Sequence, residues 1–160
     1  MDDSHQPEQK VPEFDPYGDG IVNRELRLIK DPLHARACGI LTNAAPKRFM
    51  GLITSSSRVV RAHDVHELVC SDENQLPGGT VEDVSYLAFI VFEDSGVVAV
   101  GDDFEVEGEF FGRVMGFNET HVPNHFNIVL RAESPVTGLQ AGWSPATHMT
   151  FNRPPDESEP

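Results

Sequence analysis

The sequence predicts an all-β fold, built as a single antiparallel β-barrel, with a β-sandwich as the alternative. Hydrophobic residues recur mostly at every second position, which is the period of a strand with one buried face. Thirteen glycines and twelve prolines among the 160 residues supply turns between short apolar runs. No segment combines a helical period with a capping residue, so we expect strands and turns.

The first half of the chain contains five strand candidates of irregular length. Gly39, Gly51 and the serines at 55–57 separate several of them. The one helical alternative, residues 26–37, has Pro32 in its interior, where proline disrupts a helix. The expected strands are 24–30, 33–42, 48–54, 58–63 and 65–70.

The second half of the chain is more regular. Residues 84–92 (VSYLAFIVF) are rich in β-branched and aromatic residues, which predicts a strand buried on both faces. Residues 126–132 alternate between apolar and mostly polar positions. Further strands are expected over 97–100, 104–106, 111–117 and 147–151. About eight to ten short strands of this kind are typical of a barrel or a sandwich.

The charge distribution divides the chain and excludes several functions. The formal net charge is −14, which argues against nucleic-acid binding and against docking on anionic membranes. Both ends, 1–20 and 153–160, are acidic and Pro-rich. We expect them to be disordered, or lid-like for the first, around a domain over 21–152.

Targeting signals and common catalytic motifs are absent from the sequence. No apolar run approaches the roughly 20 residues of a membrane span, and the N-terminus does not resemble a secretory signal. There is no Gly-x-Gly-x-x-Gly, P-loop, Gly-x-Ser-x-Gly or Cys-x-x-Cys motif. We therefore expect a soluble cytoplasmic protein, which as an enzyme would use acid–base or metal chemistry. The sequence leaves the oligomeric state open, with a homodimer among the alternatives.

Two short histidine clusters are the main functional signal. His63, His66 and Glu67 form one cluster, and His121 and His125 form the other, each at the edge of an expected strand. Histidine titrates nearest to neutral pH, so these residues are the candidates for acid–base catalysis. In a regular strand His63 and Glu67 share one face, and His66 lies on the other.

The same clusters allow a metal-dependent alternative. His63, Glu67, His121 and His125 together would suit Zn, Fe, Mn or Ni. Histidines and a glutamate on neighbouring strands resemble the pattern of cupins, which are double-stranded β-helix proteins. The spacing here is His-x-x-His, whereas cupins have His-x-His, so the cupin metal site is not transferred to this chain. Surface loops without a catalytic role are the third interpretation of the clusters.

Several other residues are candidates for binding a substrate. Tyr86 lies in the most apolar strand and could offer its hydroxyl, while Asn124 and Asn127 flank His125 and could orient its ring. Residues 75–80 form either an ordinary connection or a mobile loop over a pocket. Trp143 is expected to plug one end of the barrel. Six phenylalanines are expected in the core, where a few, Phe117 and Phe126 among them, could line a cavity: Phe89, Phe104, Phe110, Phe117, Phe126 and Phe151.

These features favour a small-molecule enzyme whose pocket is the barrel interior. An apolar cavity with a few histidines suits cyclisation, isomerisation or lyase chemistry on a mainly apolar substrate, as in small β-barrel cyclases of secondary metabolism. That interpretation needs no cofactor. The alternatives are a metal-dependent oxygenase or lyase and a ligand-binding barrel without catalysis.

Overall fold

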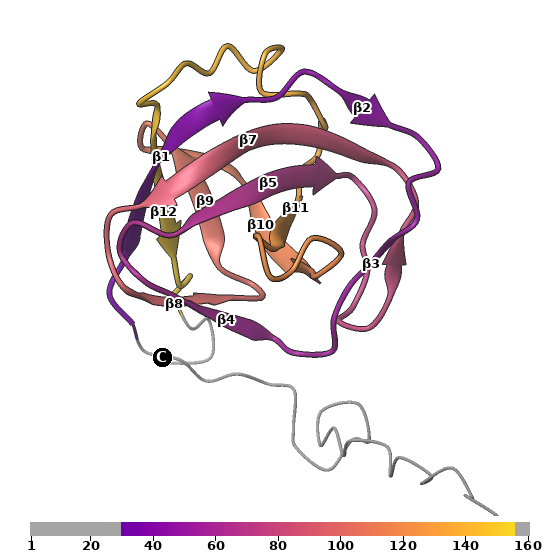
Figure 1. The fold of residues 1–160 in the computed structure, drawn as a ribbon, viewed down its shortest axis with the longest axis horizontal. Coiled ribbons are helices and arrows are strands. Elements are labelled where there is room, and N and C mark those ends of the chain that lie inside the picture. Colours follow the sequence, from indigo (N-terminus) through magenta and orange to yellow (C-terminus); the bar gives the residue numbers. More distant parts are fainter. Residues whose placement is uncertain (1–29, 156–160) are drawn as a thin grey trace, which may run out of the picture.

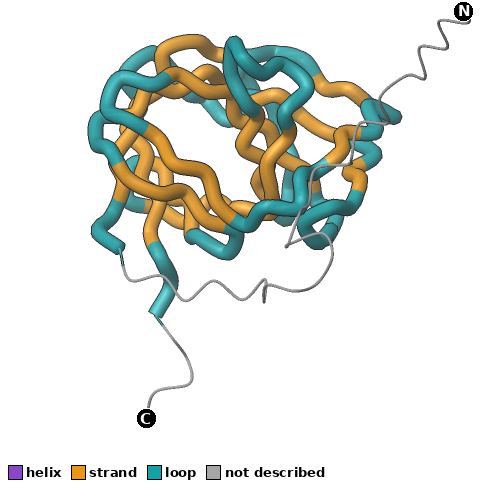
Figure 2. Tube along the Cα trace, turned by 60° about the horizontal axis from the view of Figure 1, so that its bottom comes forward, coloured by secondary structure: helices purple, strands orange, loops and turns teal. Residues whose placement is uncertain are grey.

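The computed structural model describes residues 30–155, which form strands, turns and loops without any helix (Figures 1 and 2). Within this range no helix could therefore span a membrane. The strands in chain order are β1 (Leu33–Ile40), β2 (Ala44–Ala45), β3 (Met50–Gly51), β4 (Ser57–Val60), β5 (Val65–Ser71), β6 (Thr80–Val81), β7 (Val84–Phe92), β8 (Gly96–Ala99), β9 (Asp103–Val106), β10 (Glu109–Asn118), β11 (Asn127–Arg131) and β12 (His148–Asn152). The all-β prediction is confirmed.

Seven of these strands close into a ring. The order of the large sheet is β1-β12-β9-β10-β11-β5-β7, and β7 pairs again with β1. In Figure 1, β5 and β7 lie side by side on one wall. The remaining strands form small additions: β2 extends the sheet from β7, and β3–β6 and β4–β8 are separate two-stranded sheets.

The prediction of a wholly antiparallel sheet is wrong at one pair, because β5 and β11 are parallel. Every other pairing in the ring is antiparallel. A closed ring with an odd number of strands cannot reverse direction at every step, so one pair has to be parallel. The β5–β11 pair takes this role, and the long connection between them makes a parallel pairing sterically accessible.

The interior of the ring is filled by apolar side chains. One cluster of buried residues takes members from all seven strands at alternating positions, as the strand period requires. It includes Ala35, Leu68, Ile90, Phe104, Val114, Ile128 and Phe151. Trp143 packs against this cluster and lies near the rings of Phe104 and Phe111. These side chains fill the space in which the sequence placed an apolar pocket.

A second cluster covers the outside of the ring. Its buried members are Met50, Leu52, Val69, Val81, Val84, Met115 and Val129. Val69 and Val129 are partners across the parallel pair and point away from the interior. The β3–β6 strands supply Met50 and Val81 above them. We call these residues the outer cluster.

The structure differs from the sequence prediction mainly in the short strands. Of the expected strand over 48–54, only Met50–Gly51 pairs, and the two-residue strands β2 and β6 were not predicted, because two residues show no period. Phe110 was expected in the core but is 62 % exposed. The expected strand over 24–30 and both acidic ends lie largely outside the described residues.

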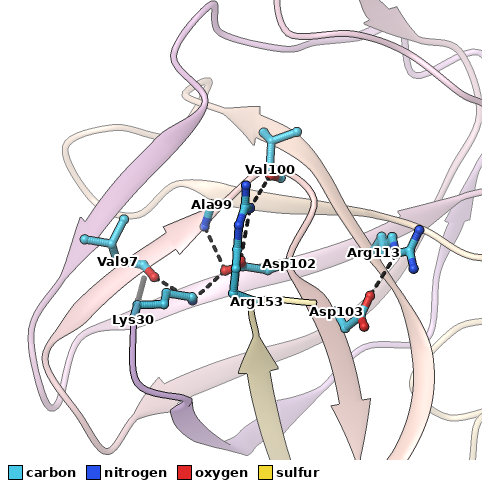
Figure 3. Close-up of polar contacts among 8 residues, drawn as sticks. All are labelled: Lys30, Val97, Ala99, Val100, Asp102, Asp103, Arg113 and Arg153. Carbon is cyan, nitrogen blue, oxygen red and sulfur yellow. Dashed lines mark hydrogen bonds and ion pairs between the residues drawn. The ribbon is translucent and has the colours of Figure 1, made fainter. Parts of the chain in front are cut away.

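A buried ion-pair network joins the two ends of the described chain to the β8–β9 turn (Figure 3). The Asp102 carboxylate is fully buried and lies 2.5 Å from Lys30 Nζ and 3.4 Å from Arg153 Nη1. It also accepts a hydrogen bond from the backbone N–H of Ala99. Lys30 Nζ donates to the Val97 carbonyl, and Arg153 Nη1 donates to the Val100 carbonyl.

Candidate acid–base site on the outer face

The parallel pairing of β5 and β11 brings the two predicted clusters together. Glu67 and Asn127 are direct partners in this register. They have the same parity as Val69 and Val129, so their side chains lie on the outer face of the ring beside the outer cluster. His125 lies two residues before β11 and reaches the same place.

Glu67 and His125 form the centre of the site. Glu67 Oε2 lies 3.8 Å from His125 Nε2, and the two side chains are only 9 % and 11 % exposed. Burial raises the pKa of Glu67 above its ordinary value, although His121 and Arg48 oppose this shift. Burial also lowers the pKa of His125, and His121 adds to this effect. The two environments thus favour a neutral imidazole beside a carboxyl group that loses its proton only at a higher pH than usual.

The hydrogen bonds of His125 fix which ring nitrogen carries the proton. The Asn124 side-chain amide donates to His125 Nδ1 over 3.2 Å. Nδ1 therefore has to be the unprotonated nitrogen of the neutral ring, and Nε2–H faces Glu67. At 3.8 Å this contact is too long for a hydrogen bond, so both groups remain open to another partner.

A chain of side-chain amides orients Asn127. Asn118 Nδ2 donates to the Gly51 carbonyl over 2.7 Å. A carbonyl can only accept, so Asn118 presents its Oδ1 to Asn127 Nδ2, and that bond is 3.0 Å long. The Asn127 Oδ1 atom consequently points elsewhere as an acceptor. Asn127 itself is fully buried.

Three buried polar atoms of this site lack a hydrogen-bond partner in the part of the chain that the structure describes. They are Glu67 Oε1, His125 Nε2 and Asn127 Oδ1. Leaving a buried polar atom unpaired costs about 1–3 kcal/mol. Together the three atoms offer one N–H donor and two oxygen acceptors, which matches a ligand that carries a carbonyl and a hydroxyl or an acidic C–H group.

Aromatic and cationic side chains surround the three atoms. The Phe89 ring meets His125 edge-on with centroids 5.2 Å apart, and the His121 ring stacks on His125 at 5.0 Å. Arg48 Nε donates to the Tyr86 hydroxyl over 3.2 Å. Tyr86, named from the sequence as a substrate-binding candidate, packs against the outer cluster. His121 is exposed and lies at the solvent side of the site.

Several residues predicted for the site lie elsewhere. The prediction that His63 shares a face with Glu67 is wrong, because β5 begins only at Val65 and His63 is an exposed turn residue with a φ of 75°. His66 points to the opposite face, where its ring stacks on Phe126 at 3.6 Å. Phe117 and Phe126 belong to the interior cluster and not to the surroundings of Glu67.

The structure does not assemble the four-residue metal site that the sequence allowed. Across residues 30–155, no three His, Cys, Asp or Glu side chains are arranged to hold a metal ion. No hydrogen bond, ion pair or ring contact within this range joins the His63 side chain to Glu67, His121 or His125. Glu67 and the two downstream histidines remain close to one another without it.

Sequence reasoning missed three residues that shape the site. Asn118 becomes important only through its register with Asn127, Phe89 only through its register with Glu67, and Arg48 only through the fold of the 43–53 segment. Asn118 does carry a signal, since a polar residue ends an otherwise apolar strand. Arg48 and Phe89 carry none that a single sequence displays.

Comparison with curated proteins gives no significant match, and neither does comparison with solved structures. A family profile does match residues 27–152, which include every residue of the site described above. The chain therefore belongs to this family, a family of unknown function designated DUF6917.

Proposed function

We propose that this protein is a small-molecule enzyme of the cyclase, isomerase or lyase type, in which Glu67 and His125 act as an acid–base pair. The seven-stranded ring serves as a small β-barrel scaffold whose packed interior keeps the outer face rigid. The observation that carries the proposal is the meeting of three buried polar atoms without partners at Glu67, His125 and Asn127. Unpaired buried groups with shifted pKa values are typical of functional sites.

The proposed chemistry is a proton transfer next to a carbonyl group. The Glu67 carboxylate removes a proton from the carbon beside the carbonyl. The electron pair of that C–H bond forms a C=C bond to the carbonyl carbon, and the π electron pair of the C=O bond moves to the carbonyl oxygen. His125 Nε2–H donates a hydrogen bond to this oxygen as its charge develops. The Glu67 carboxyl group then returns the proton to another carbon, or a leaving group departs from the intermediate. Asn127 Oδ1 accepts a hydrogen bond from a hydroxyl of the substrate.

The electrostatics of the site suit these roles. A carboxylate with a raised pKa is a stronger base than a carboxylate with the ordinary pKa. A neutral imidazole can donate a hydrogen bond from its N–H group without carrying a positive charge. Phe89 and Tyr86 offer apolar surface to the body of the substrate. An apolar substrate with one carbonyl and one hydroxyl group fits this combination.

The test is hydrogen exchange in D₂O with a panel of hydroxyketones, lactones and enones, followed by mass spectrometry. We expect the wild-type protein to incorporate deuterium beside the carbonyl of at least one compound. Glu67→Gln should slow this exchange by about 100-fold or more, the range that general-base catalysis contributes. Glu82→Gln, an exposed glutamate on the loop between β6 and β7, is the matched control and should not change it.

Other outcomes assign other functions. Compounds that bind at the site without exchange would show a ligand-binding protein. Exchange that is lost on treatment with EDTA and restored by Zn²⁺ would show a metal-dependent enzyme. Equal exchange rates for Glu67→Gln and the wild type would overturn the proposed role of Glu67.

A further inference from the structure

A groove of about 790 Å³ lies apart from the acid–base site. Its walls come from the loop at 74–77, the first half of β10, and the segments at 100–101 and 131–134. None of Glu67, His125 and Asn127 lines it. The volume falls in the range of small-molecule binding sites, about 300–1,000 Å³.

One wall of the groove is apolar and open to solvent. Phe110 is 62 % exposed and Leu76 is 78 % exposed, and both line the groove together with Phe111 and Met115. The loop that carries Leu76 is held in place, because the backbone N–H of Gln75 donates to Met115 Sδ over 3.3 Å. Large exposed apolar side chains that face one groove mark an interaction site.

The positive charge of the second part of the chain gathers at this groove. Residues 61–160 contain only four Lys and Arg residues, which are Arg61, Arg113, Arg131 and Arg153. Arg113 and Arg131 line the groove together with one acidic residue, Glu133. Arg153, which pairs with Asp102, contacts the carbonyl of Val100, another lining residue, through Nη1. In a chain with a net charge of −14, this is a local concentration of guanidinium groups.

The two lining arginines are direct cross-strand partners in the β10–β11 pair. Like charges directly opposite each other destabilise a sheet. Arg113 Nε donates to Asp103 over 2.8 Å, whereas Arg131 makes no ion pair or side-chain hydrogen bond with residues 30–155. An anion bound beside Arg131 would offset the repulsion between the two guanidinium groups.

We propose that this groove binds a small organic carboxylate that carries an apolar chain or ring. Arg131 binds the carboxylate through its guanidinium group, and Arg113 adds to the positive potential. The apolar body of the ligand lies on Phe110 and Leu76. This groove shares none of the residues Glu67, His125 and Asn127 with the acid–base site, so carboxylate binding here does not depend on the proposed enzyme activity.

The test compares 4-phenylbutyrate with 4-phenylbutan-1-ol, which has the same apolar body without the charge. Binding is measured on the full chain by two-dimensional NMR, in which the amides of Gly101, Gly112 and Ala132 report on the groove. We expect 4-phenylbutyrate to shift these signals and to bind at least about tenfold more tightly than the alcohol. Arg131→Gln should weaken the binding of the carboxylate about tenfold or more and leave the alcohol unchanged.

Three further variants distinguish binding in this groove from binding elsewhere on the protein. Arg36→Gln removes an exposed strand arginine on β1 and should leave binding unchanged. Phe110→Ser should weaken both ligands, and Glu67→Gln should affect neither. The proposal is overturned if the carboxylate and the alcohol bind equally, if Arg131→Gln binds the carboxylate like the wild type, or if the shifted signals lie outside the groove.

Discussion

At the scale of single residues, His66 and Glu67 are adjacent in β5, and their side chains lie on opposite faces of the sheet. The His66 ring lies against Phe126 and Phe92, and its Nδ1 accepts a hydrogen bond from the backbone N–H of Phe126 over 3.2 Å. A protonated ring could not accept this bond. His66 therefore supports the fold in its neutral form, while Glu67 faces the candidate site.

Because its pKa is lowered by burial, His66 should reduce the free energy of unfolding in acid. Burial lowers the pKa of His66 from 6.5 to about 4, so the unfolded chain takes up this proton at a higher pH than the folded protein. The contribution is complete above about pH 6.5 and is lost as the pH falls toward 4. We expect His66→Asn, which keeps an acceptor without titrating, to reduce the loss across this window by about 1–3 kcal/mol.

The measurement is urea unfolding of both proteins between pH 4 and pH 7. The control is Arg36→Gln, at an exposed position of β1, which should leave the pH dependence as it is in the wild type. Parallel stability curves for the wild type and His66→Asn would contradict the assignment.

For Glu67 we expect the opposite dependence of protein stability on pH. Its pKa is raised in the folded protein, so the folded state holds this proton more tightly than the unfolded chain. Stability is then lost as the pH rises from the unfolded pKa of about 4.5 through the higher folded value. Glu67→Gln should be more stable than the wild type at pH 8 by about 1–2 kcal/mol, and the difference should shrink below pH 4.5.

Chemical denaturation at the two pH values tests this prediction, with Glu82→Gln as the exposed control. A variant that is less stable than the wild type at pH 8 would show that the Glu67 carboxylate stabilises the fold. Greater stability combined with lost activity is the trade-off expected of a functional site.

At the scale of elements, the segment between β11 and β12 depends on close contact with β7. The register of β5 and β7 shifts at Leu87, and the Leu87 carbonyl accepts a hydrogen bond from Leu41. Gly138 packs directly on this carbonyl, and its own N–H donates to the Tyr86 carbonyl. A Cβ atom at Gly138 would lie 1.9 Å from Leu87 O, which no adjustment of a side chain can relieve.

Gly138→Ala is therefore expected to lower the free energy of unfolding by more than about 3 kcal/mol. Gly51→Ala is the matched control, because a Cβ there meets no atom within 4 Å. That variant should stay within about 0.5 kcal/mol of the wild type. Thermal and urea unfolding of both variants test the prediction, and equal stabilities would show that the segment can move away from β7.

At the scale of the whole molecule, the Asp102 network in Figure 3 holds both ends of the described chain on the β8–β9 turn. Removing one partner of a buried ion pair leaves the other charge buried and unpaired, which costs about 3–5 kcal/mol. Asp102→Ala is expected to lose this amount, because Lys30 is only 8 % exposed.

A substitution of the neighbouring residue, Asp103→Ala, is the control for Asp102→Ala. Asp103 pairs with Arg113, whose side chain is 60 % exposed, so Asp103→Ala should cost less than about 1 kcal/mol. Urea unfolding distinguishes the two variants. Similar stability losses for both would mean that the Asp102 network does not hold the ends together. Lys30→Met with Asp102→Leu should recover part of the loss, since apolar side chains can replace a buried pair.

The all-β class, most of the strands and the two histidine clusters follow from the amino-acid sequence alone. Residues 84–92 were predicted with the bounds they have, because β-branched and aromatic residues favour a strand. The period of two also separated Glu67 from His66 correctly, since neighbouring side chains in a strand point to opposite faces.

Which of these faces meets which neighbour depends on the three-dimensional fold. Alternation assigns residues to two faces but does not tell which face turns inward, so the sequence placed the pocket inside the ring, where the structure packs apolar side chains. The odd number of strands forces one parallel pair, and that pair aligns Glu67 with Asn127. Such register depends on contacts between residues about 60 positions apart in the chain, which local patterns do not encode.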